Sequence, residues 1–336
     1  MNRYLLTILI ILLFAVRPFC QVIGNYHKDS IDLRNIREMQ INLDTSLRSA
    51  ETPSLPVNII RVADVRFDTT YIGLYTSFTN IVYPIIRNYK ISFKGGARQN
   101  IEVYLNNYFG KKFGDDNNEV VIFLKKLKII KRDTITANAS IKNIGQINLE
   151  TEVFLKSGKI FYAAFKIDTA FVERLAINKN EISDEMKENL LMPALRFLQN
   201  KISSTDWGKV LLKKPFEESA VHENYYNNRF NLPILTQPYK RGVYKTFSEF
   251  INNSPAIPDF TIKRDKARTV SLIDKTGNYI NTLQIFGFND GGQCWIQRGN
   301  YCFPLIRTGN SFSFFISFGL NLKLLYTVDM EKGDLH

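Results

Sequence analysis

The stretch INLETEVFLKSGKIFYAAFKI, residues 147–167, decides the fold class. Apolar side chains at Ile147, Leu149, Val153 and Leu155 alternate with mostly polar neighbours, which is the period of two expected for a half-buried strand. Ser157-Gly158 is a turn sequence, and the β-prone residues after it predict a return strand. The stretch therefore predicts a β-hairpin within a sheet that buries one face.

Strand and helix patterns also precede this hairpin. Residues 59–67, 89–93 and 120–132 are rich in β-branched and aromatic residues and predict three further strands. Gly95-Gly96 opens a predicted helix that ends near Gly110. The apolar face of this helix repeats at helical spacing and consists of Ile101, Tyr104, Leu105, Tyr108 and Phe109.

A second helix follows the hairpin. Asp184 and Glu185 suit the positive end of a helix, and Pro193 predicts a kink or a division into two short helices. The predicted fold class of residues 59–211 is therefore α+β, a mixed sheet with helices packed on one face.

The remaining chain has a different pattern. Residues 212–242 contain three prolines and little periodicity, which predicts a linker. Residues 243–320 contain short strands separated by turn sequences, which predicts a β-rich domain built as a meander or a small barrel. Residues 321–336 are interpreted as a C-terminal tail, and residues 21–58 as a lead-in segment. A length of 336 residues agrees with two domains.

Residues 1–20 predict a secretory signal peptide. Arg3 precedes an apolar run over residues 4–16, which is too short to cross a membrane as a helix of about 20 residues. Cleavage is expected between Cys20 and Gln21, and lipid attachment at Cys20 is the alternative. The protein is therefore expected to be exported, to the periplasm, to the outer membrane or to the outside of the cell.

The amino-acid composition excludes fewer classes of function than the predicted signal peptide does. The net charge is +12, and it falls to +10 once Arg3 and Arg17 are removed with the signal peptide. A basic exported protein can be attracted to acidic glycans or anionic lipid, although charge also serves solubility alone. Partners expected are an envelope protein or a glycan, with association to the outer membrane and no nucleic acid.

Two cysteines remain in the predicted mature chain, Cys294 and Cys302. A hairpin with a three-residue turn that pairs Ile296 with Asn300 would place them opposite each other. Because exported proteins encounter oxidising conditions, the spacing predicts a disulfide bond between them.

Four stretches resemble a family of exported Bacteroidota proteins of unassigned activity. They are the strand at residues 121–127 with its lysine-rich end, IFYAAFKIDT at residues 160–169, YKTFSEF at residues 244–250 and FGFNDG at residues 286–291. The resemblance covers residues 60–318. It implies export and a two-part layout, and it carries no catalytic residues. The element order of the first part is also similar to small envelope domains that accompany transport and assembly machines.

Two basic features are candidate anion sites. Lys94, Gly95, Gly96 and Arg98 join a strand to a helix, where backbone N–H groups could hold an anion; a tight turn that glycine permits is the alternative. Lys125, Lys126, Lys128, Lys131 and Arg132 form a basic strand. Cross-strand ion pairs of Lys126 and Lys128 with Glu150 and Glu152 are the expected explanation of its charge.

Two further sets of residues are candidate sites in an exported protein. Trp295, Arg298 and Tyr301 near one hairpin could contact a sugar, or could belong to the core and its rim. Asp followed by Ser or Thr resembles the O-glycosylation pattern of exported Bacteroidota proteins. The candidate acceptors are Ser30, Thr69, Thr134 and Thr169.

The motifs in the chain disfavour several enzyme classes. His27, His222 and His336 lie far apart in segments without a triad or HExxH spacing, and neither a metal cluster nor a cofactor motif can be drawn. We therefore expect a non-enzymatic envelope protein that binds or scaffolds, without a cofactor. One alternative is a glycan-active enzyme that uses carboxylates such as Asp259, Asp265, Asp274 and Asp290. The other is a polyanion or lipid-surface binder.

Overall fold

The computed structural model describes most of the chain after the predicted signal peptide. Its described residues are 36–43, 59–78, 86–110, 118–135, 141–175, 184, 186–264, 270–299, 301–318 and 322–335. The predicted signal peptide, Cys20 and Ser30 lie outside them.

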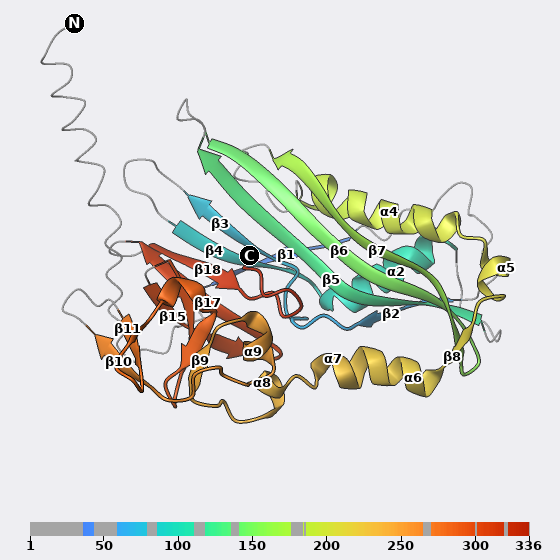
Figure 1. Cartoon of the computed structure of the whole chain (residues 1–336). Helices are drawn as coiled ribbons and strands as arrows, with labels where there is room; N and C mark the ends of the chain where they lie inside the picture. Colours follow the sequence, from blue (N-terminus) through green and yellow to red (C-terminus); the bar gives the residue numbers. More distant parts are fainter. Residues whose placement is uncertain are drawn as a thin grey trace, which may run out of the picture.

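One large mixed sheet dominates the fold (Figure 1). Its order is β1-β4-β3-β5-β6-β7-β8, and β2 also pairs with β5. The strands are β1 (Arg37–Ile41), β2 (Ile59–Asp64), β3 (Gly73–Phe78), β4 (Ile86–Phe93), β5 (Asn118–Ile135), β6 (Ile141–Ser157), β7 (Ile160–Leu175) and β8 (Pro215–Glu217). The predicted hairpin is confirmed as β6 and β7, with Gly158 in a left-handed conformation at φ 59°.

Both β2 and β3 lie along the same edge of β5, one after the other, with a stretch of β5 between them that neither strand pairs with. β2 runs parallel to β5 from Ile59 to Asp64, whereas β3 pairs parallel with it only at Gly73 and Leu74. A Cβ at Gly73 would lie 2.7 Å from the carbonyl oxygen of Ile129, so glycine permits this close approach. Between the two strands, residues 65–72 leave the sheet and form what we call the β2–β3 loop.

Two long helical segments cover one face of the large sheet. They comprise α2 (Gly96–Tyr108), then the π-helical turn η2 (Lys187–Leu191) that leads into α4 (Met192–Ser203), followed by the short α5 (Trp207–Val210). Their buried residues include Ile101, Leu105 and Leu195, which pack with Ile122 and Val153 of the sheet. Both predicted helices are confirmed, and Pro193 stands in the first turn of α4, after the π-helical turn.

The predicted linker is instead part of the fold. Its helical pieces α6 (Glu218–His222), η3 (Glu223–Asn227) and α7 (Asn228–Phe230) cover the opposite face of the sheet (Figure 1). Tyr225 stacks on Phe123 at 4.2 Å between ring centroids, and Val221 packs in the same cluster. The helices predicted for residues 59–211 share one face as expected, whereas the other face is covered by this segment, for which a linker was predicted. Aromatic side chains, which carry no helical period here, hold this segment against the sheet.

The C-terminal part consists of three small antiparallel sheets, and one of them pairs residues 242–244 with residues 287–289, which are distant in the sequence. A turn, α8 (Pro233–Thr236), leads into β9 (Gly242–Tyr244) and α9 (Phe247–Ile251). The other elements are β10 (Phe260–Arg264), β11 (Val270–Asp274), β12 (Tyr279–Ile280), η4 (Thr282–Gln284), β13 (Gly287–Asn289), β14 (Cys294–Arg298), β15 (Tyr301–Pro304), β16 (Ile306–Thr308), β17 (Ser311–Phe318) and β18 (Leu322–Thr327). Phe312 and Phe314 of β17 are buried in their core.

The predicted tail contains a strand. β18 pairs with β17 from Leu322 to Thr327, and Thr327, Val328 and Asp329 are buried. The end of the chain therefore belongs to the folded body and lies against β5, as described below.

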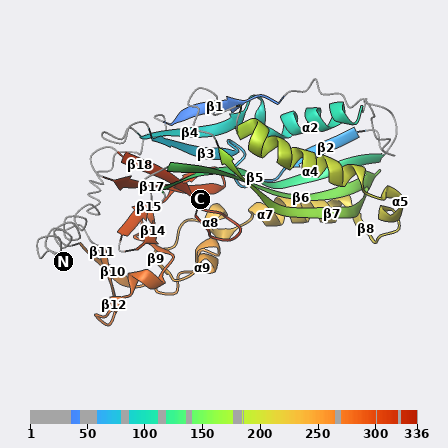
Figure 2. The same cartoon turned by 90° about the horizontal axis from the view of Figure 1, so that it is seen from above.

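The fold is strand-rich and mixed α/β, with a curled mixed sheet, so the coarse fold class is confirmed. The division into two domains is not confirmed. Figure 2 shows the C-terminal sheets beside one end of the large sheet. Among the described residues, the helices are all too short or too polar to cross a membrane.

Candidate functional site

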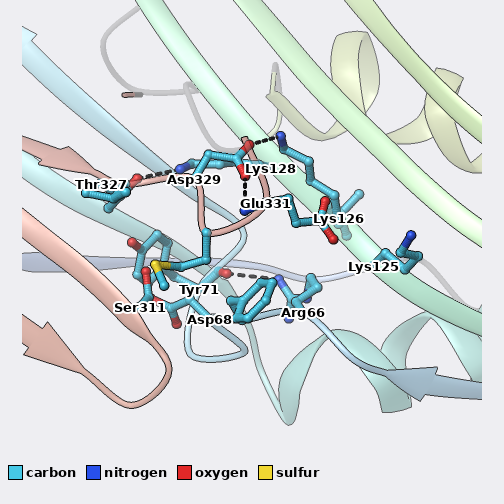
Figure 3. Close-up of a pocket in the computed structure, with 14 residues that line it drawn as sticks. Arg66, Asp68, Tyr71, Lys125, Lys126, Lys128, Ser311, Thr327, Asp329 and Glu331 are labelled. Atoms are coloured by element: carbon cyan, nitrogen blue, oxygen red, sulfur yellow. Dashed lines mark hydrogen bonds and ion pairs between the residues drawn. The ribbon is translucent and has the colours of Figure 1, made fainter. Parts of the chain in front are cut away.

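A charged cavity lies where β5 passes the β2–β3 loop. β2 ends opposite Leu124 and β3 begins opposite Ile129, so the stretch of β5 between them has the β2–β3 loop beside it instead of a strand. We call residues 327–335 the C-terminal segment; it packs over this stretch (Figure 3). The cavity is partly open and has a volume of about 70 Å³. It is lined by Arg66, Phe67, Asp68, Tyr71, Lys125, Lys126, Leu127, Lys128, Ser311, Thr327, Val328, Asp329, Met330 and Glu331. We call the contact between β5 and the C-terminal segment the seam.

A β-bulge determines which lysine meets the neighbouring strand. Leu124 pairs with Thr151, but Lys126 pairs with Glu150, so Lys125 is the extra residue. Its ammonium group lies 2.9 Å from Glu150 and 3.3 Å from Glu152. Lys125, and not Lys126 or Lys128, therefore forms the ion pairs predicted with these two carboxylates. The prediction assumed regular alternation along the strand, and the bulge interrupts that alternation.

Lys126 and Lys128 reach the C-terminal segment instead. Lys126 forms an ion pair with Asp329, and Lys128 donates a hydrogen bond to the hydroxyl of Thr327 (Figure 3). The second carboxylate oxygen of Asp329 accepts the backbone N–H of Glu331 at 2.9 Å and that of Lys332 at 3.3 Å. Asp329 therefore joins the end of the chain to β5 and also caps the turn after it.

Burial shifts the protonation of two groups in the cavity. It lowers the pKa of Lys128 to about 8; the carboxylates of Asp329 and Asp68 oppose the shift, and Lys126 reinforces it. It also raises the pKa of Tyr71, and the nearby carboxylate of Asp68 raises it further. Both effects follow from enclosing the groups at the seam, because burial penalises a charged form that water would stabilise.

A second cluster borders the cavity, around two carboxyl groups. Burial raises the pKa of Glu331, and its neighbour Glu150 adds to that effect against the opposing charge of Arg229. Burial also acts to raise the pKa of Glu150, but its ion pair with Lys125 outweighs this and lowers it. The guanidinium of Arg229 pairs with Glu331, donates to the backbone oxygen of Val65 at 2.6 Å, and lies 4.7 Å from the ring centre of Phe67.

Arg66 fixes the β2–β3 loop that forms one wall. Its side chain is buried and forms a two-pronged pair with Asp64, at 2.8 and 2.7 Å. A third nitrogen donates to the backbone oxygen of Tyr71 at 2.9 Å. The guanidinium therefore closes the loop on itself and is not directed toward a ligand.

The predicted sugar-contact residues do not share one surface. Trp295 stacks parallel to Phe288, at 6.0 Å between ring centroids, and donates to the carboxylate of Asp290 at 2.9 Å. Arg298 and Tyr301 are cross-strand neighbours on the other face of the hairpin. Arg298 lines a separate hollow of about 280 Å³ that also contains Lys245, Gln284 and Gln297.

The predicted disulfide bond is not formed, and both Cys294 and Cys302 are free thiols. Arg298 pairs with Tyr301, so two residues rather than three separate the strands, and Cys302 lies opposite Gln297. The register thus differs by three residues from the one that opposes the two cysteines, and an odd change of register turns a side chain to the other face of a sheet. The thiols thus enter different apolar clusters, and burial raises their pKa values to about 11 and about 12.

The remaining candidate residues are dispersed over the fold. Gly95 and Gly96 both have positive φ, and Lys94 and Arg98 are exposed beside them at the start of α2. Thr69 is exposed in the β2–β3 loop, and Thr169 is half-buried in β7 opposite Leu149. Thr134 lies in β5, but its side chain is not among those that the structure describes.

Two of the four aspartates proposed for a carboxylate enzyme cap turns. Asp274 caps a turn by accepting from Thr276 and Asn278, and Asp290 does so for Gly292 and Gln293. Asp259 adjoins β10, and Asp265 lies outside the described residues. The carboxyl pair that the structure brings together, Glu150 with Glu331, was not predicted because these residues are far apart in the sequence.

Comparisons with known proteins add no assignment: no family model, no curated protein and no solved structure matches the chain. Within the described part of the chain, no group of three or more His, Cys, Asp or Glu side chains could hold a metal ion. The resemblance to exported Bacteroidota proteins stays a prediction.

Proposed function

We propose that this chain is an exported, non-enzymatic binding or scaffold component of the cell envelope. Export rests on the signal-peptide pattern of residues 1–20. The observation that carries the scaffold role is the seam, in which three lysines of β5 join the C-terminal segment and β6 to one another. A joint of this kind holds the large sheet and the C-terminal sheets in one fixed relation, as a scaffold requires.

The size and charge of the cavity favour this role over catalysis. Pockets that bind small organic ligands usually have volumes of about 300–1,000 Å³, whereas this one has about 70 Å³. Glu150 and Glu331 lie close together, as glycosidase carboxylates do. However, Lys125 holds the first and Arg229 holds the second, so both are engaged in ion pairs within the protein.

The same contacts weigh against a polyanion or lipid-surface binder. That function would require the basic strand to present its lysines to solvent without partners. Lys125, Lys126 and Lys128 are directed to Glu150, Asp329 and Thr327 instead. Their charge is used within the fold.

Incubation of the mature chain with a panel of envelope and dietary glycans tests the non-enzymatic assignment. We expect no release of reducing ends above the rate without protein, because the carboxyl pair is enclosed and neutralised. In parallel, crosslinking of the tagged chain in the envelope of exporting cells is expected to recover a partner at constant stoichiometry.

Two single variants define the result that would contradict the non-enzymatic assignment. Glu331→Gln removes one member of the carboxyl pair, and Glu188→Gln is its matched control because Glu188 is 57% exposed on η2. Glycan cleavage by the wild type that falls at least about 100-fold in Glu331→Gln, but not in the control, would establish the carboxylate enzyme instead.

A further inference from the structure

The outer edge of β7 is covered along only part of its length. β8 pairs with Ile160, Phe161 and Tyr162, and the ammonium of Lys213 then binds the backbone oxygens of Ala163 and Ala164 at 2.9 and 2.8 Å. From Phe165 to Leu175, no strand among the described residues pairs with this edge, although β6 pairs with the other edge throughout. Figure 2 shows β7 along this border of the large sheet.

The uncovered stretch is held in place by its inner face. Ile167 and Leu175 are buried, and Phe171 contacts Phe197 of α4 at 5.6 Å between ring centroids. The edge is therefore a preformed template for another strand, because its backbone geometry is already set by packing.

The outer face of the same stretch has a mixed pattern of side chains. Asp168, Ala170, Val172 and Arg174 alternate along it, and all four are exposed. Val172 is 57% exposed, which is high for a large apolar residue of the described chain. An acidic group, two apolar groups and a basic group thus follow one another in one line.

We propose that this edge pairs antiparallel with the same edge of a second copy of the chain, with Phe171 on the two-fold axis. Asp168 then lies opposite Arg174 of the second copy, and Ala170 lies opposite Val172. On the helix face, Phe171 meets itself and Ile167 meets Leu175. Each of these opposite pairs is complementary in charge or in polarity.

Neighbouring registers lack this complementarity. Sliding one copy by two residues, which keeps α4 of both copies on one side of the sheet, places Lys166 opposite Arg174 and Asp168 opposite Val172. If the copy slides by two residues in the other direction, Arg174 of one copy lies opposite Ala170 of the other and no longer opposite Asp168. The self-complementary pattern therefore favours a second copy as the occupant over an unrelated strand.

Two existing contacts are compatible with this pairing. The ammonium of Lys166 lies 2.8 Å from Glu152 of its own chain, and Asp168 is 3.9 Å from the ammonium of Lys332 with a side-chain exposure of 73%. Asp168 thus retains room for Arg174 of the second copy. The proposal of self-pairing goes beyond the proposed function, because it does not depend on which other molecule the protein binds.

Sedimentation velocity of the mature chain over a micromolar concentration series tests the pairing. We expect a reversible dimer whose dissociation constant rises about tenfold in Asp168→Arg and in Arg174→Asp, because each pair occurs twice across the axis. The double variant, with both charges exchanged, is expected to return to within about threefold of the wild type.

Matched controls separate this register from general charge effects. Lys209→Asp on α5 changes the net charge as Arg174→Asp does, and it should leave dimerisation unchanged because Lys209 is 81% exposed and pairs with Asp206 of its own turn. Melting temperatures of all variants establish that each one folds. A wild type that stays monomeric at roughly 100 µM, or a double variant that remains as weak as the single ones, would overturn the proposal.

A covalent trap tests the register without charge reversal. Oxidation of an equimolar mixture of Ala170→Cys and Val172→Cys should give more crosslinked dimer than either variant alone, because only the mixture places two thiols opposite each other. Leu212→Cys, at a position 85% exposed, serves as the control for random collision. Equal crosslinking in all samples would contradict the register.

Discussion

Replacing Asp329 by Ala lowers the free energy of unfolding by about 3 kcal/mol at neutral pH. The side chain of Asp329 is 6% exposed and that of its partner Lys126 is 16% exposed, so the variant leaves an enclosed ammonium group without its counter-charge. Two backbone N–H groups also lose their acceptor. Urea denaturation of the mature chain, followed by far-UV circular dichroism, measures the change.

The matched variants locate this effect in the buried pair. Lys126→Met combined with Asp329→Asn removes both charges and keeps an acceptor for the two backbone N–H groups, and we expect it to lie within about 1 kcal/mol of the wild type. Glu188→Ala, at an exposed acid, should change stability by less than about 0.5 kcal/mol. A loss in Asp329→Ala as small as that of Glu188→Ala would mean that the seam is not a structural joint.

The second large effect concerns pH. The pKa of Lys128 falls from 10.5 in the unfolded chain to about 8 in the folded one. Between these two values the unfolded state binds more protons, so folding stability gains from this residue as pH rises from 8 toward 10.5. The full gain is roughly 3 kcal/mol, since one pKa unit corresponds to about 1.4 kcal/mol.

Lys128→Met isolates this contribution, because the variant carries no titrating group at the position. Urea denaturation of both proteins at pH 7 and at pH 9.5 gives the difference between them at each pH. We expect the wild type to gain stability relative to the variant as pH rises. A difference independent of pH, or one that changes in the opposite sense, would show that the ammonium of Lys128 is not buried at the seam.

The parts of the fold that were predicted correctly depend on local patterns. The alternation in β6, the turn at Gly158 and the helical spacing in α2 are set by residues within one or two turns of the chain. Sheet order and the packing of residues 212–242 depend on distant contacts, and the sequence carried no such information.

The candidate site was missed for the same physical reason. Asp329 is 203 residues from Lys126, and a single sequence does not indicate that these positions meet. In addition, the bulge at Lys125 gives this lysine the carboxylate partners that were expected for Lys126 and Lys128. The hairpin register differed by three residues from the expected one, which separated Cys294 from Cys302. These last two errors arose where an irregularity in a strand or a turn shifted the pairing that a local pattern predicts.

The most direct test of the central claim, that the seam unites the large sheet and the C-terminal sheets in one rigid body, uses the two tryptophans of the chain. Trp207 lies in α5 against the large sheet, and Trp295 lies in β14 of the C-terminal part. Replacing each in turn by Phe leaves one fluorescent reporter in each part. We predict that the two unfold in urea with midpoints that agree within about 0.3 M. Unfolding of Trp295 at a clearly lower concentration than Trp207 would contradict the account, because the C-terminal part would then be a separate unit.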